Sequence, residues 1–129
     1  MTTISVSEPT TIGLSERAHG LLKRLVEDKR NGQFAEMADA YRFAIGLALA
    51  HRVIPGEVPT PRTTIFNVGT LDPDKAIYGA VRTLVDTGSM SVYRWAERLA
   101  EWGVEELYRK FELGKVDVAD ILSEVEGTT

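Results

Sequence analysis

Few residues of the chain combine the types and the spacing that catalytic or metal sites require. The 129 residues include no cysteine, so disulfides and thiolate metal sites are excluded. Glu16 and the histidine His19 share one face of a predicted helix, but a metal site needs roughly three or four ligands and no second such pair is present. No serine stands in a nucleophile elbow, and no glycine-rich phosphate loop occurs. We therefore expect no catalytic residue, no metal and no cofactor.

Two acidic groups resemble acid–base pairs but also have structural explanations. Asp72 and Asp74 flank Pro73, which is typical of a helix start, so we interpret both as helix caps. The second group recurs every fourth position on one predicted helix, with arginines nearby. This spacing predicts a solvated face of ion pairs. The residues concerned are Glu97, Glu101 and Glu105 with Arg94, Arg98 and Arg109.

The densest basic group lies near the N-terminus and is the candidate nucleic-acid-binding surface. Arg17 and Arg24 are seven residues apart, so they share the helix face opposite the apolar stripe. Such a group can neutralise several backbone phosphates, and ordinary surface charge is the alternative. Its members are Arg17, Lys23, Arg24, Lys29 and Arg30.

The net charge of −4 is unevenly distributed along the chain. Residues 1–62 hold eight Lys/Arg and seven Asp/Glu, whereas residues 63–129 hold seven and twelve. The acidic half argues against a nucleic-acid surface across the whole protein, so a DNA contact should lie in the N-terminal half. The same acidity favours an alternative, in which acidic helices bind a basic protein partner.

A strand followed by a capped helix should present this basic group. Residues 10–14 predict a short strand with Ile12 and Leu14 on one face and Thr11 and Gly13 on the other. Ser15 is a suitable N-cap for the helix that follows. Apolar residues then recur with helical spacing, and the Asn-Gly pair at 31–32 should end the helix.

The second predicted helix, residues 34–51, is apolar on almost every side and rich in small residues. Such a helix must be central to a fold or to an oligomer, and its small residues allow another helix to approach closely. We expect a homo-oligomer assembled around it. The predicted interface residues are Phe34, Met37, Tyr41, Ile45 and Leu49.

These elements predict one domain, 1–129, that is mainly α with a short N-terminal strand and about five helices. A strand-helix-helix unit, 10–52, precedes a proline-rich connector, 53–62, and an acidic helical unit, 63–126. That last unit should hold a strand at 63–68 and helices from about Asp72, Ser91 and Asp117. Trp95 and Trp102 should pack in a core or an interface, with base stacking as the alternative.

The strand and the two helices resemble two families. Thr11 to Ser15 followed by two helices resembles the ribbon-helix-helix pattern, in which the strand pairs with its twin across a dimer and outward residues read the major groove. Here the outward residues would be Thr11 and Gly13, with no Arg, Lys, Asn or Gln to read a base edge.

A second resemblance, over residues 11–110, is to the small DndE-type and Dnd-associated proteins of bacterial DNA phosphorothioation systems. It implies a mostly helical oligomer that binds duplex DNA through a lysine-rich surface without cutting it, although lysine is scarce here. The resemblance is carried by Ile12, Leu14, Ser15, Arg17, Ala18, Leu22 and Leu25, by the alanine-rich second helix ending Ala48-Leu49-Ala50, and by Ile54-Pro55.

The sequence thus predicts a non-catalytic, DNA-associated accessory protein of a DNA-modification or defence system. A protein–protein adaptor or antitoxin-like oligomer is the alternative, and a small enzyme with its site between subunits is a third class. The N-terminus has no basic segment followed by an apolar one, and charges interrupt the apolar run at 34–50, so we expect a cytoplasmic protein without membrane contact.

Overall fold

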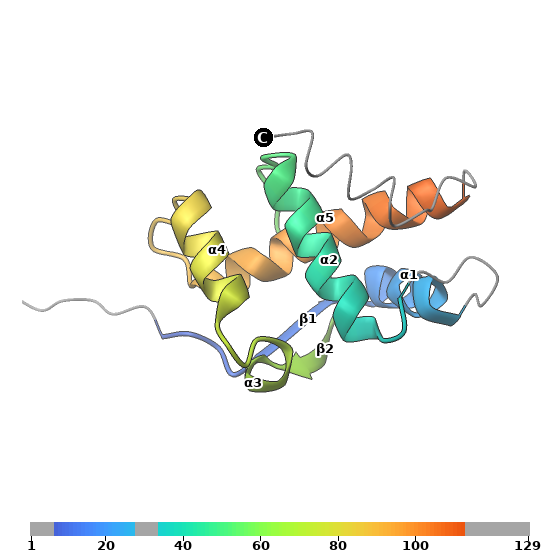
Figure 1. Cartoon of the computed structure of the whole chain (residues 1–129), viewed down its shortest axis with the longest axis horizontal. Coiled ribbons are helices and arrows are strands. Elements are labelled where there is room, and N and C mark those ends of the chain that lie inside the picture. Colours follow the sequence, from blue (N-terminus) through green and yellow to red (C-terminus); the bar gives the residue numbers. More distant parts are fainter. Residues whose placement is uncertain (1–6, 28–33, 113–129) are drawn as a thin grey trace, which may run out of the picture.

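The computed structural model describes residues 7–27 and 34–112, and these form helices packed against a two-stranded sheet (Figure 1). The predicted helix from Asp117 and the predicted helix end at 31–32 lie outside the described residues. A single cluster of buried side chains draws on both halves of the chain. The elements are β1 (Thr11–Ser15), α1 (Glu16–Glu27), α2 (Met37–Ala50), β2 (Arg62–Asn67), α3 (Val68–Leu71), α4 (Ala76–Leu84) and α5 (Val92–Glu112).

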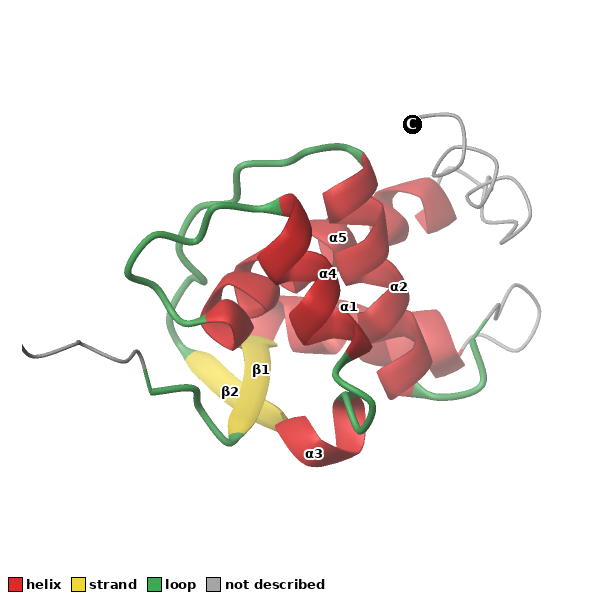
Figure 2. Ribbon diagram, turned by 60° about the vertical axis from the view of Figure 1, so that its left-hand side comes forward, coloured by secondary structure: helices red, strands yellow, loops and turns green. Residues whose placement is uncertain are grey.

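The sheet joins strands from the two halves of the chain and lies at one end of the helices (Figure 2). β1 pairs antiparallel with β2, with an irregularity between Ile12 and Gly13. The backbones come so close that a Cβ on Gly13 would lie 1.9 Å from the carbonyl oxygen of Thr63, so only glycine fits there. Because β2 belongs to the same chain, β1 already has a partner strand, unlike the strand of a ribbon-helix-helix dimer.

The expectation that Gly13 points outward from β1 is wrong, because both faces of the strand are covered at that position. Residues 12–15 are all buried, and only Thr11 is partly exposed. Gly13 therefore faces the interior, where it cannot reach a DNA groove.

Helix α1 begins as predicted. The Ser15 hydroxyl accepts a hydrogen bond from the Ala18 N–H at 3.1 Å, which is the contact of an N-cap. The buried stripe consists of Ala18, Leu22 and Leu25, so the opposite face is left to solvent. The predicted orientation of the helix is therefore confirmed.

Helix α2 is a central helix of the described residues, and it packs against α1, α4 and α5. It lies across α5, with α1 and α4 on either side, and its most extensive contacts are with α5 (Figure 1). A Cβ on Gly103 of α5 would lie 2.1 Å from the Ala44 carbonyl oxygen, which shows how closely the two backbones approach. The small residues of α2 thus allow the close contact that the sequence predicted. The helix begins at Met37, three residues after the predicted start at Phe34.

The two predicted carboxylates do accept N–H groups at the start of helix α4, but the helix begins later and its N-cap position is held by Lys75 rather than by Asp72. The Asp72 carboxylate accepts hydrogen bonds from two backbone N–H groups at its start, at 2.9 and 3.0 Å, and Asp74 accepts one from Ala76 at 3.1 Å. However, the helix starts at Ala76 rather than at Pro73. The reason is that α3 occupies the chain up to Leu71, and a turn ending at Lys75, with a φ of 58°, separates the two helices.

Helix α5 begins at Val92, one residue after the predicted start at Ser91. The Ser91 hydroxyl accepts a hydrogen bond from the Arg94 N–H at 3.2 Å. The Glu8 carboxylate accepts two more, from Val92 at 2.9 Å and from Tyr93 at 3.0 Å. This cap fixes the helix whose side chains line the candidate site.

Candidate functional site

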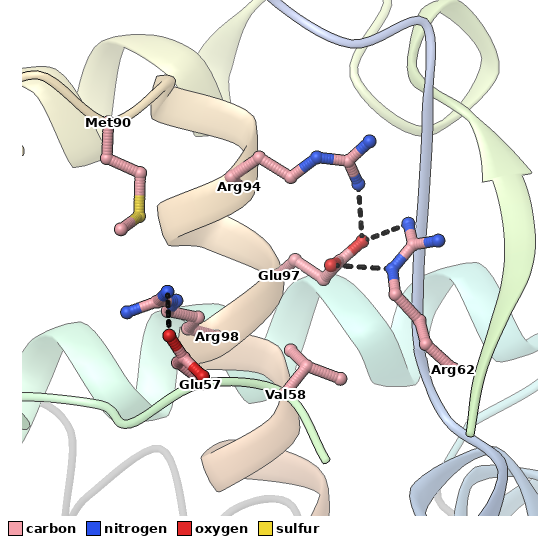
Figure 3. Close-up of a pocket in the computed structure, with 7 residues that line it drawn as sticks. All are labelled: Glu57, Val58, Arg62, Met90, Arg94, Glu97 and Arg98. Carbon is pink, nitrogen blue, oxygen red and sulfur yellow. Dashed lines mark hydrogen bonds and ion pairs between the residues drawn. The ribbon is translucent and has the colours of Figure 1, made fainter. Parts of the chain in front are cut away.

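Glu97 of α5 is the anchor of a polar cluster at the junction of α5, β1 and β2. Its side chain is only 4% exposed. It accepts hydrogen bonds from the Gly13 N–H at 2.8 Å, from Nε and Nη2 of Arg62 at 2.8 and 2.5 Å, and from Nη1 of Arg94 at 3.1 Å (Figure 3). Burial alone would raise the pKa of this carboxyl, but the Arg62 guanidinium, the Gly13 N–H and Arg94 together hold it below the ordinary value. Glu97 is therefore an ionised carboxylate whose oxygens are occupied by hydrogen bonds within the protein.

Glu101, one turn later, binds the same strand. Its carboxylate accepts hydrogen bonds from the Ser15 N–H at 2.9 Å and from the Ser15 hydroxyl at 2.7 Å. Two glutamates thus satisfy the edge of β1 that faces away from β2, where backbone N–H groups would otherwise be buried without acceptors.

The predicted solvated acidic face is therefore wrong for Glu97 and Glu101. It holds for Glu105, which is partly exposed and forms an ion pair with Arg17. A signal for the buried pair did exist in the sequence. Four helical residues rise about 6 Å, and alternate strand residues are about 6.7 Å apart, so glutamates four apart match N–H groups two apart on a strand.

Three arginines line a surface pocket of about 480 Å³ beside Glu97, and two of them, Arg62 and Arg94, contact its carboxylate (Figure 3). Arg62 comes from β2, whereas Arg94 and Arg98 lie one turn apart on α5. Their side chains are 28%, 41% and 23% exposed. Arg98 points toward Glu57, whose carboxylate is 3.8 Å away and 88% exposed. The other lining residues are Val58 and Met90.

The predicted basic group lies on the outer face of α1. Lys23 and Arg24 are exposed, and Arg17 is 73% exposed although it pairs with Glu105 of α5. The guanidinium of Arg24 donates a hydrogen bond at 3.1 Å to the hydroxyl of Tyr108, a neutral partner. The structure thus brings together these three members of the group. Lys29 and Arg30 lie outside the described residues.

The predicted interface residues divide into two sets. Tyr41 and Ile45 are buried inside the single chain, and the Tyr41 hydroxyl donates a hydrogen bond at 2.8 Å to the Gly13 carbonyl oxygen. These two residues cannot contact a second copy of the chain, because other side chains of the same chain cover them. The others are partly buried against the core and remain accessible, and self-association stays a prediction. The accessible residues are Phe34, Met37 and Leu49.

The two tryptophans of α5 are partly buried and pack against the core. The Trp102 ring lies beside the His51 ring, with centroids 5.8 Å apart. Trp95 lines a second pocket, of about 560 Å³, beside Ile54 and Leu84. These last two side chains are 88% and 68% exposed, so an apolar surface lies beside this pocket.

Comparison of the chain with protein-family models, curated proteins and solved structures gave no match. Within residues 7–27 and 34–112, no group of three or more acidic or histidine side chains is placed to hold a metal ion. None of the helices described has the length and apolar character needed to cross a membrane.

Proposed function

We propose that this protein is a non-catalytic, DNA-associated accessory protein, in keeping with a role in a DNA-modification or defence system in the cytoplasm. The outer face of α1 contacts backbone phosphates through Arg17, Lys23 and Arg24. The observation that carries this proposal is the position of these three cations on the solvent-facing side of a helix whose other side is anchored in the core. Exposed lysines and arginines on one helix face can neutralise adjacent phosphates without reading sequence.

Three carboxylates of the acidic C-terminal half are buried, which weakens the argument that the charge of this half would repel DNA. Asp72, Glu97 and Glu101 belong to the acidic half of the chain, but each is buried and accepts backbone N–H groups. The surface that a DNA strand would meet is therefore less acidic than the sequence suggests. The same observation weakens the alternative of an acidic docking surface for a basic partner.

Glu105 limits the strength of the proposed contact. It pairs with Arg17, so DNA must compete with this carboxylate for the guanidinium. Because the Arg17 side chain is 73% exposed and that of Glu105 42% exposed, the ion pair is weak and opens readily. Lys23 and Arg24 form no ion pair with a carboxylate among the described residues, although Glu27 and Glu112 act on Arg24 through their charges. We therefore expect these two cations to contribute more than Arg17.

The test is an electrophoretic mobility shift with duplex DNA over a series of salt concentrations. We expect binding at low salt that weakens steeply as salt rises, with a log–log slope of about −0.9 for each phosphate neutralised. Lys23→Ala combined with Arg24→Ala should make the slope shallower by about 2. The matched control is Lys75→Ala with Arg82→Ala, two cations at α4 that should leave the slope unchanged. Parental binding by the α1 variant would show that the assigned surface is wrong.

A protein–protein adaptor is the second candidate. It is favoured by Ile54 and Leu84, which are strongly exposed beside the pocket that Trp95 lines. Large apolar side chains gathered beside a pocket are typical of protein-binding surfaces. Absence of any DNA shift at low salt would favour the adaptor over the DNA-associated protein.

A further inference from the structure

The arginine pocket, lined by Arg62, Arg94 and Arg98 with Glu57, Glu97, Val58 and Met90, is separate from the face of α1. We propose that it binds a phosphate monoester. The phosphate group takes the place of the Glu57 carboxylate at Arg98, in a pocket that Arg62 and Arg94 also line. This site goes beyond the proposed contact with a DNA backbone, because the two surfaces share no residue.

Glu97 cannot serve as the counter-ion that fills the pocket. Its oxygens already accept four hydrogen bonds, and the carboxylate is buried against Gly13. Arg62 is held in place by two of these bonds. Arg94 gives one of its five donors to Glu97, and Arg98 gives none. Guanidinium donors therefore remain for a ligand at the pocket surface.

Glu57 occupies the ligand position only loosely. Its side chain is 88% exposed, and 3.8 Å from Arg98 is too long for a hydrogen bond. Exposed ion pairs of this kind contribute little, so a stronger anion displaces Glu57 at small cost. Phosphate is such an anion, because it offers several oxygens to the forked donors of arginine.

The charges of the pocket match a dianion. Three guanidinium groups and one buried carboxylate line the pocket once Glu57 has moved away, which leaves two positive charges. A phosphate monoester carries close to two negative charges near neutral pH, whereas a phosphodiester within a strand carries one. The pocket therefore favours a terminal or free monoester over an internal phosphate.

The pocket also has room for an organic group beside the phosphate. Its volume of about 480 Å³ is within the range of small-molecule sites. Val58 and Met90 form apolar walls, and Met90 lies on the same side of α5 as Arg98 and Glu57 (Figure 3). The flexible Met90 side chain can pack against ligands of different shape. A bare phosphate ion would leave these walls without contacts.

Two kinds of molecule carry this chemistry, namely a free nucleoside monophosphate and the 5′ end of a nucleic-acid strand. The experiment is isothermal titration calorimetry of the full chain at constant ionic strength set with sodium chloride. The probes are inorganic phosphate, adenosine 5′-monophosphate, and one single-stranded oligonucleotide with and without a 5′-phosphate. We expect the monophosphate to bind more tightly than inorganic phosphate. Binding of the phosphorylated strand that exceeds both this affinity and the affinity of the unphosphorylated strand would identify a strand end as the ligand. Phosphate-dependent binding weaker than that of the monophosphate would identify a free nucleotide.

Three variants test the geometry. Arg98→Gln should weaken binding of the best probe by at least about tenfold, because it removes a charge-assisted contact. Glu57→Gln should strengthen the same binding, because it removes the competing carboxylate. Arg82→Gln, on the exposed side of α4, is the matched control and should leave the affinity unchanged. All three side chains are partly or fully exposed, so unchanged thermal unfolding midpoints should confirm that the variants fold.

Three results would overturn the proposal. One is that no probe binds with a Kd below about 1 mM. Another is equal binding of the strand with and without its 5′-phosphate, together with no binding of the monophosphate. The last is parental affinity in Arg98→Gln or weakened affinity in Glu57→Gln. None of these results depends on the duplex contact of α1, which is tested by its own variants.

Discussion

Replacing Glu97 by glutamine tests whether one buried carboxylate connects the strand, the helix and the arginine pocket. The amide oxygen of Glu97→Gln can still accept one hydrogen bond. The amide nitrogen is a donor and would face the donors of Arg62, which now bind both carboxylate oxygens. The variant therefore loses its charge and at least part of the bidentate contact, while its shape is nearly unchanged.

The loss of unfolding free energy in Glu97→Gln can be estimated from the exposure of Arg62 and Arg94. Removing one member of a fully buried ion pair costs about 3–5 kcal/mol. Arg62 and Arg94 are 28% and 41% exposed, so their freed donors regain water and the lower end applies. We expect the free energy of unfolding to fall by about 3 kcal/mol at pH 7, and Tm to fall by about 10 °C.

The assay is urea unfolding followed by circular dichroism, with Glu105→Gln as the matched control on the same helix. Glu105 is 42% exposed and pairs with the exposed Arg17, so its substitution should change stability by less than about 1 kcal/mol. A loss in Glu97→Gln no larger than that of the control would refute the role assigned to Glu97.

Acid provides an independent check, because the pKa of Glu97 is lower in the folded protein than its ordinary value of 4.5. A depressed folded pKa contributes stability that is present above the unfolded value and is lost as pH falls through the folded value. The difference between parent and Glu97→Gln should therefore be full at neutral pH and shrink below about pH 4.5. A difference that stays constant into acid would contradict the ionised carboxylate.

Two further predictions concern the packing around the central helix. Gly103→Ala should destabilise the protein by about 2 kcal/mol or more in urea unfolding, because its Cβ would lie 2.1 Å from the Ala44 carbonyl oxygen. Gly20→Ala has open space around its Cβ, so it should stabilise the protein by up to about 1 kcal/mol. Equal effects of the two alanines would contradict the close approach of α2 and α5. Tyr41→Phe should cost about 1–2 kcal/mol, because it leaves the buried Gly13 carbonyl oxygen without its donor at 2.8 Å. An unchanged urea midpoint would show that this hydrogen bond contributes nothing.

Local patterns in the sequence predicted much of the fold. Ser15 before an apolar stripe indicated where α1 begins, and its hydroxyl caps that helix. Asp72 and Asp74 indicated the caps of α4, because the preference of a carboxylate for helix N–H groups depends on a few neighbouring residues. The offset of three residues at Ala76 arose from α3, a short helix without a strong signal of its own.

The candidate site was harder to predict, because its chemistry depends on distant partners. Glu97 is 84 residues from Gly13 and 35 from Arg62, and its neighbours on α5 are arginines that resemble a solvated face. Only the packing of α5 against β1 distinguishes Glu97 and Glu101 from the exposed Glu105. The arginine pocket was missed for the same reason, since Arg62 lies on β2 and its two companions lie on α5.

The position of β1 in the chain has a consequence for synthesis. A ribosome makes residues 11–15 before their partner strand at 62–67 and before their carboxylate acceptors at 97 and 101. Until α5 has emerged, the nascent strand holds N–H groups that only water or another chain can satisfy. Closing such distant contacts is slow, and unpaired strands are prone to aggregate. The completed protein, in contrast, offers no open edge on the outer side of β1 at residues 13 and 15, because the carboxylates of α5 occupy it.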